Sequence, residues 1–155
     1  MSYCYQITST GIEAILKSCR FIRKLILGGY LKAIEGDNSE LPEVNLEDLT
    51  ISSSMIDDEG LAAIAKKCPR LVSLASSYCR NVTTEGIKQI VKNITTLKCL
   101  YMLGGKLINR DDLLEWMLST GNLASLEKIY VGINYDFSEE QRDKFLHHGC
   151  LLTKR

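Results

Sequence analysis

The residues best suited to chemistry in this chain are two histidines and a cysteine near its C-terminal end. His147, His148 and Cys150 lie close together in the sequence, and both imidazole nitrogen and thiolate sulfur are ligands of zinc. Adjacent helical residues point about 100° apart, so the two histidines cannot grip one ion as an i, i+4 pair does. We interpret both as residues of the last turn of a helix, where positive charge suits the negative end of the helix dipole. No metal site is expected.

The other candidate groups do not form a recognisable catalytic motif. Glu139 and Glu140 are a carboxylate pair, but they fall in the first turn of a predicted helix, where acidic residues stabilise the N-terminus. The glycine pairs at 28–29 and 104–105 follow predicted strands without opening a P-loop or a dinucleotide-binding motif. We expect a protein that is not an enzyme and has no cofactor. Catalysis through a reactive thiol is the alternative.

The elements that would position these groups follow from an internal repeat. The segments 2–15 and 77–90 share Ser-Tyr-Cys, then Thr, Gly-Ile and Ile at equal offsets. The shift from Ser2 to Ser77 is 75 residues, which equals three units of 25. Each unit contains an apolar triad of the form L-x-x-L-x-L. The central triad residues are Leu25, Leu49, Leu74, Leu100 and Ile129.

The second half of each unit predicts a helix. An apolar residue precedes a residue that can cap a helix N-terminus, followed by helical apolar spacing. The expected caps are Thr8, Asp57, Thr83, Asn109 and Ser138. Ser138 and Gln141 have the spacing of a capping box, and Gly121 is expected to end a helix in a left-handed conformation. Trp116 occupies an apolar helical position and is expected in the core. Each unit is therefore a short strand, a turn and a helix.

This pattern is a leucine-rich repeat, and segment 68–87 resembles a named subtype. The run from Cys68 to Leu74, then Tyr78-Cys79-Arg80-Asn81-Val82-Thr83 and Gly86-Ile87, is similar to the cysteine-containing leucine-rich repeat of F-box/leucine-rich-repeat proteins. The resemblance extends from Ser2 to about Cys150. It implies an α/β solenoid of the ribonuclease-inhibitor type, with about five strand–helix units. Short parallel strands would lie on the concave side and helices on the convex side.

We expect residues 1–155 to form a single repeat domain that starts in the middle of a repeat. The segment 31–44 contains Gly36-Asp37-Asn38-Ser39 and Pro42, which predict an irregular loop. That loop is either a solvated connector or a contact for a partner. Because Tyr3-Cys4 stands where a strand should already have passed, we hypothesise a C-terminal part of a longer repeat protein or a truncated gene product. At the other end, Gly149 to Leu152 predicts a short apolar edge segment.

Composition limits the partners and the compartment. Lys plus Arg equals Asp plus Glu, 19 against 19, which argues against nucleic acid and against an anionic membrane surface. No apolar run is long enough for a membrane span, and no secretory signal is visible. Two pairs of cysteines share repeat positions, which favours stacked thiols in a cytoplasmic or nuclear protein over disulfides or metal ligands. The pairs are Cys4 with Cys79 and Cys19 with Cys68; Cys99 and Cys150 fit neither.

The function expected from these features is protein binding on the concave side. Alternate strand residues face away from the core. The predicted binding residues are Ile26, Thr50, Ser52, Ala75, Ser77, Tyr101, Leu103 and Tyr130, with Gly28 and Gly132 beside them. The family resemblance implies that this module presents a target to an SCF-type ubiquitin ligase for degradation. A Skp-type adaptor would bind only a longer form that contains an F-box. The alternatives are a stand-alone repeat adaptor or truncated product without a ligase link, and an unpartnered face whose tyrosines are ordinary exposed aromatics.

Overall fold

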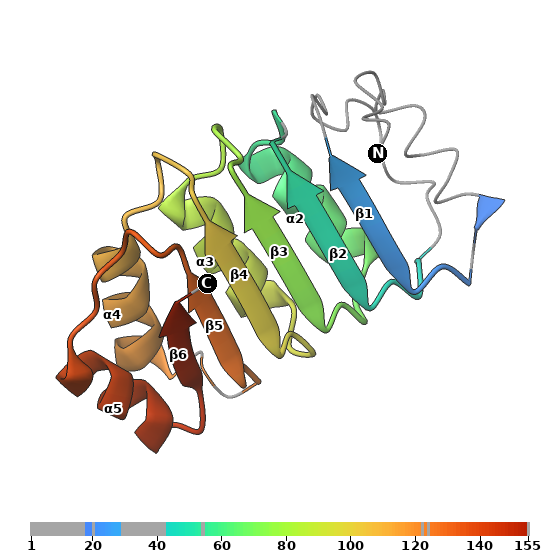
Figure 1. Cartoon of the computed structure of the whole chain (residues 1–155). Helices are drawn as coiled ribbons and strands as arrows, with labels where there is room; N and C mark the ends of the chain where they lie inside the picture. Colours follow the sequence, from blue (N-terminus) through green and yellow to red (C-terminus); the bar gives the residue numbers. More distant parts are fainter. Residues whose placement is uncertain are drawn as a thin grey trace.

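The computed structural model describes residues 18–19, 21–28, 43–53, 55–121, 123 and 125–154. Within these residues the protein is an α/β structure with a six-stranded parallel sheet and four helices (Figure 1). The strands are β1 (Lys24–Gly28), β2 (Asp48–Ser52), β3 (Ser73–Ser77), β4 (Cys99–Leu103), β5 (Lys128–Val131) and β6 (Leu151–Lys154). The helices are α2 (Asp58–Lys67), α3 (Thr84–Asn93), α4 (Arg110–Thr120) and α5 (Glu139–His147).

The strands lie in the sheet in the same order as in the chain, and every neighbouring pair is parallel. Their register aligns the central triad residues, as the repeat predicted, and adds one residue of β6 to the row. That row is Leu25, Leu49, Leu74, Leu100, Ile129 and Leu152. Burial alternates along each strand, because successive side chains point to opposite faces. The expected apolar edge segment at Leu151 and Leu152 is therefore confirmed as strand β6.

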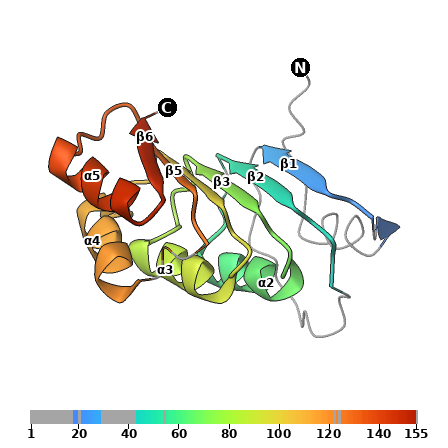
Figure 2. The same ribbon diagram turned by 90° about the horizontal axis from the view of Figure 1, so that it is seen from below.

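The described helices lie on one side of the sheet (Figure 2), so the core is the layer between them. All four begin where the sequence predicted, because the expected residues cap them: Asp57, Thr83, Asn109 and Ser138. Ser138 and Gln141 form the capping box, with hydrogen bonds of 3.1 and 3.0 Å. Helix α4 ends at Gly121, whose φ of 67° is left-handed. The short turns at both ends of each helix fix where successive strands enter the sheet.

Polar contacts between successive units hold these helix starts in place. Asp58, the first residue of α2, accepts hydrogen bonds from the backbone N–H and the hydroxyl of Thr83, at 2.9 and 2.5 Å. Thr84, the first residue of α3, accepts one from the backbone N–H of Asn109 at 2.8 Å. Gly86 is packed so closely that an added Cβ would lie 2.0 Å from Oδ1 of Asp58. Gly86 therefore packs directly against the preceding unit.

Gly60 is also closely packed, because an added Cβ would lie 2.6 Å from the side chain of Ile56. Two expectations about other residues need correction. Cys19 is exposed whereas its repeat partner Cys68 is buried. The physical reason is that β1, which follows Cys19, has a described strand on only one side. Trp116 is half-buried against the core, with the ammonium of Lys88 5.7 Å from its ring centroid.

The remaining expectations fall outside the described residues. They concern Cys4, the Thr8 cap with the helix after it, and almost all of the loop 31–44. Of that loop the structure describes residues 43 and 44, where buried Val44 donates a backbone hydrogen bond of 2.9 Å to the carbonyl of Lys67. The far end of that segment is therefore anchored to the end of α2.

Candidate functional site

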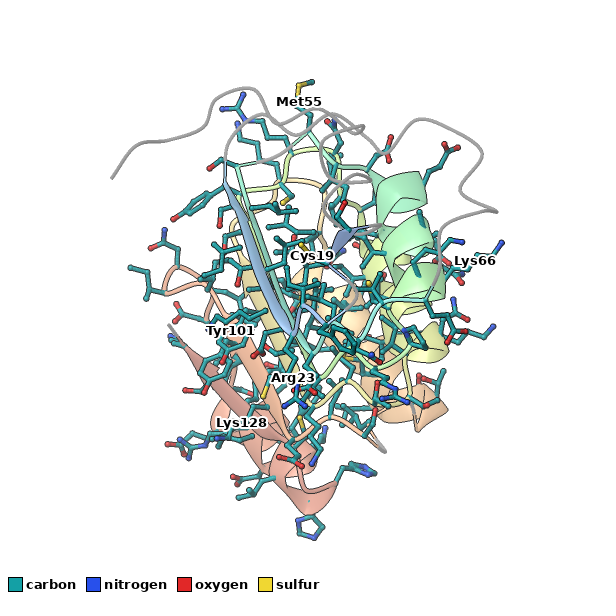
Figure 3. The ribbon with its side chains drawn as sticks, turned by 90° about the vertical axis from the view of Figure 1, so that its right-hand side faces the viewer. Cys19, Arg23, Met55, Lys66, Tyr101 and Lys128 are labelled. Carbon is teal, nitrogen blue, oxygen red and sulfur yellow. The ribbon has the colours of Figure 1, made fainter. Side chains whose placement is uncertain are left out.

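The candidate site is the face of the sheet opposite the helices, called here the open face. The strand pairing brings the predicted binding residues into two parallel rows on this face. The first row is Ile26, Thr50, Ala75, Tyr101 and Tyr130, continued by Thr153 on β6. The second row is Gly28, Ser52, Ser77 and Leu103. Figure 3 shows Tyr101 and Lys128 on this side, with Lys66 of α2 on the opposite side.

Tyr101 and Tyr130 are stacked on neighbouring strands. Their ring centroids are 4.3 Å apart, and the ring planes differ by 1°. This contact follows from the register, since the two residues are direct partners across β4 and β5. Stacking fixes the side-chain rotamers of both rings before any ligand arrives, so a partner would lose less conformational entropy on binding them. The pair is a broad, rigid, largely apolar surface with two hydroxyl groups at its end.

A shallow hollow of about 470 Å³ lies beside the tyrosine pair on strands β1 to β4. Its lining residues are Lys24, Ile26, Asp48, Thr50, Ser73, Ala75, Ser77, Tyr101 and Leu103. Small side chains at the middle strands, such as Ala75 and Ser77, form its floor because they project least from the backbone. Ile26, with 64% of its surface exposed, and Leu103 stand on the outer strands. The depression therefore results from the order of side-chain sizes across four neighbouring strands.

Sequence reasoning missed a third row on the open face. It consists of the residues immediately before each central triad residue: Lys24, Asp48, Ser73, Cys99, Lys128 and Leu151. The signal was available, because strand alternation places residues two before and two after Tyr101 on the same face as Tyr101 itself. This row carries the charges that the first two rows lack. The open face thus has one charged row beside two rows that are neutral.

Charged residues around the third row act on the thiol of Cys99. Burial is the largest cause that raises the pKa of the Cys99 thiol. Lys128 lowers this pKa, whereas Glu127 and Asp48 raise it further. Lys24 and Asp48 are direct partners in the register, yet the ion pairs within 4.0 Å among the described residues do not include them. Both side chains line the hollow on the open face.

The carboxyl end of β3 carries an unusual exposed aromatic residue. Tyr78 is 66% exposed and adopts a left-handed backbone with φ 57°, a conformation that costs a residue with a side chain about 1–2 kcal/mol. Its ring lies over Gly104, because a Cβ added there would be 2.7 Å from Cδ1 of Tyr78. The glycine of the next loop thus makes room for the ring. Tyr78 is therefore an exposed aromatic residue that packs on the loop after β4.

The histidines at the end of α5 line a different hollow from the one on the open face. His147 ends the helix and His148 follows as its C-cap, close to the predicted last turn. Both side chains are exposed. They line a hollow between α4 and α5 with Leu118, Asp143 and the ion pair of Glu140 with Lys144 at 2.7 Å. In the part of the chain that the structure describes, no three His, Cys, Asp or Glu residues are grouped closely enough to hold a metal ion.

None of the cysteines among the described residues forms a disulfide. Burial raises the pKa of Cys68 to about 11. Burial, with a smaller contribution from Cys99, raises that of Cys150 to about 12. Cys79 is buried and its thiol donates to the carbonyl oxygen of Ile51 at 3.7 Å, so it joins two neighbouring units. A nucleophilic cysteine needs a lowered pKa and access to solvent, which are the opposite conditions.

Comparison with known families adds no assignment. No protein-family model matches the chain. None of the described helices has the length and apolar character needed to cross a membrane. The open face remains the candidate site, because aromatic, aliphatic and small side chains lie there beside a row that contains Lys24, Asp48 and Lys128.

Proposed function

We propose that this chain is a leucine-rich-repeat module that binds a partner protein through its open face. The observation that carries the proposal is the stacked pair of Tyr101 and Tyr130 beside the hollow. Tyrosines dominate the binding energy of many protein interfaces because they bury a large area with only two rotatable bonds. The hollow beside them can accept an apolar side chain of the partner. The mixture of flat aromatic surface, small polar groups and isolated charges is typical of protein recognition.

The repeat assignment draws on the periodic sequence and is compatible with the parallel sheet. The resemblance to F-box/leucine-rich-repeat proteins makes the partner a candidate substrate of an SCF-type ubiquitin ligase. In that role the module would hold the target while other subunits carry out the ubiquitin transfer. A stand-alone adaptor would use the same face without the ligase.

Site-specific photo-crosslinking tests the binding face. A photoreactive phenylalanine analogue is placed at Thr50 or Tyr130 on the open face, and at Lys66 or Lys92 on exposed helical positions as matched controls. In cells we expect the two open-face positions to crosslink the same partner and the helical positions not to crosslink it. Equal yields of that partner from both faces would refute the proposal.

The ligase link needs a separate experiment. Recombinant chain is mixed with a purified Skp-type adaptor, and binding is measured by calorimetry. We expect no binding by these 155 residues, since the sequence contains no F-box segment. Degradation of the crosslinked partner should slow when cullin activation is blocked in cells that express an F-box-containing form. An unchanged half-life would favour the stand-alone adaptor.

A further inference from the structure

The geometry points to an amphipathic α-helix of the partner as the ligand of the open face, lying across the strands from β1 towards β5. This inference rests on the proposed function and names the class of partner. Its basis is the arrangement of three rows on the face, one charged and two neutral, together with the spacing of the strands. The helix would place apolar side chains on the neutral rows and charged side chains along the charged row.

The width of the face matches a helix. The charged row and the two neutral rows are separated by two residues each along every strand, so the outer rows lie about 13 Å apart. An α-helix with its side chains is about 10–12 Å across. A helix centred on the middle row therefore nearly matches this width, and side chains on its two flanks can extend to the outer rows. An extended peptide is narrower and would leave one row uncovered.

The repeat distance along the face also favours a helix. Neighbouring strands are about 4.8 Å apart, whereas a helix turns every 5.4 Å and an extended chain repeats on one face about every 6.7 Å. Over the three spacings from β1 to β4, a helix drifts out of register by about 2 Å and an extended chain by about 6 Å. Each helical turn can therefore contact its own strand across the hollow. An extended peptide loses this match after two strands.

The charged row specifies the charges of the helix. Lys24, Asp48 and Lys128 lie on the first, second and fifth strands, with neutral Ser73 and Cys99 between the last two. A complementary helix carries a carboxylate opposite Lys24 and a cation one turn away, at i+3 or i+4, opposite Asp48. A second carboxylate opposite Lys128 falls four strands from Lys24, about 19 Å along the ligand. The helical position that shares a flank with the first carboxylate and comes nearest to this distance is i+14, four turns and about 21 Å away.

The neutral rows specify the apolar side of the helix. The hollow takes an aliphatic side chain over Ala75, between Ile26 and Leu103. The stacked tyrosines take the next apolar residues further along the helix. Charges along one flank and apolar residues along the adjacent face together describe an amphipathic helix.

A displayed peptide library provides the test. The library presents helix-forming peptides of about 18 residues, long enough to span about 27 Å, randomised along one side and selected against the full chain. We expect enriched peptides to show apolar residues at helical spacing and the charge order acid, base, acid described above. Binding of an enriched peptide and of its charge-reversed version is then measured by fluorescence anisotropy. We expect at least about a tenfold preference for the first.

Variants of the chain make the test specific. The double variant Lys24→Asp/Asp48→Lys should reverse the preference at the first two charges, while Lys66→Asp on α2 is the matched control and should leave it unchanged. Ala75→Glu fills the floor of the hollow with a charge and should abolish selection. Circular dichroism and urea unfolding verify that each variant folds.

Three outcomes would overturn the inference. They are enrichment of proline-containing or non-helical sequences, equal binding of both charge orders, and no enrichment above the Ala75→Glu background. These failures are separable from failure of the proposed function. If Thr50 and Tyr130 still crosslink a partner while helical peptides do not bind, protein binding stands and only the helical form of the ligand is wrong.

Discussion

The carboxylate of Asp58 on α2 binds the N-cap residue of the following helix, accepting hydrogen bonds from both the backbone N–H and the hydroxyl of Thr83. Thr83 in turn accepts a hydrogen bond from the backbone N–H of Gly86 at 3.4 Å. One side chain thus connects two successive helices through the residue that starts the second. The contact is partly buried, where hydrogen bonds to a charged group are worth more than on the surface.

Asp58→Ala should therefore destabilise the protein by about 2 kcal/mol, because it removes two charge-assisted hydrogen bonds. The matched control is Glu59→Ala, which removes an exposed carboxylate from the same helical turn. This change should lower the free energy of unfolding by only about 0.3–1 kcal/mol. Urea unfolding measures both. Equal losses would mean that the helix dipole, and not the contact with Thr83, explains the effect.

Gly86→Ala should destabilise the protein by about 1–3 kcal/mol, since its new methyl group would collide with the Asp58 carboxylate. In an ordinary helix the same change is favourable by about 0.5–1 kcal/mol. In a protein that already carries Asp58→Ala the colliding oxygen is absent. Adding Gly86→Ala to that variant should therefore leave its stability unchanged or raise it. Thermal and urea unfolding of the unchanged chain, the two single variants and the double variant give the coupling energy between Asp58 and Gly86. If the two stability changes simply add, the Gly86 methyl group does not collide with Asp58.

Replacing Tyr78 separates backbone strain from ring packing. Tyr78→Ala and Tyr78→Gly both remove the ring from Gly104, but only glycine relieves the left-handed backbone. The glycine variant should be more stable than the alanine variant by about 1 kcal/mol. At Ser77, which has ordinary strand geometry, the order should reverse. The same order at both positions would exclude strain at Tyr78.

Thiol labelling distinguishes exposed from buried cysteines. With iodoacetamide near neutral pH, Cys19 should react fast because it is exposed, and Cys68, Cys79 and Cys150 should react only when the protein unfolds. Peptide mass spectrometry over time gives the rate at each site. Rapid labelling of Cys68 or Cys150 in the folded protein would revive catalysis through a reactive thiol.

The buried thiols should also make the protein sensitive to alkali. Unfolded cysteines lose their protons near pH 9.0, whereas folded Cys68 and Cys150 keep them to about pH 11 and about pH 12. Over this window the unfolded chain binds fewer protons, so the free energy of unfolding falls as the pH rises. Urea unfolding at about pH 8 and about pH 10.5 measures the loss. Cys150→Ala should show a smaller loss; an identical slope would assign the effect to other groups.

Much of the fold was predictable because it depends on local rules. The spacing of Leu49, Leu74 and Leu100 predicted three strands and their alignment, since a fixed repeat length brings equivalent residues together. The caps at Asp57 and Thr83 predicted the helix starts, because a cap acts within three residues of itself.

The open face was predictable only in part. Strand alternation identified the two neutral rows, and the same rule applied one step further would have identified Lys24, Asp48 and Lys128. Predicting that Tyr101 stacks on Tyr130 would have required the register of β4 with β5. Predicting that Cys19 is exposed would have required knowing that it precedes a strand at the edge of the described sheet. Such features depend on residues that lie far apart in the chain.

By itself the sequence determined the repeating strand and helix pattern, the parallel α/β class and most of the residues that face away from the helices. These follow from hydrophobic spacing and capping chemistry, which act over a few residues. Only the tertiary structure decided that Asp58 joins Thr83, that Gly86 must lack a side chain, and that small residues on four strands leave a hollow beside two stacked tyrosines. Those outcomes depend on the distance between neighbouring units, which the packing of the whole molecule sets.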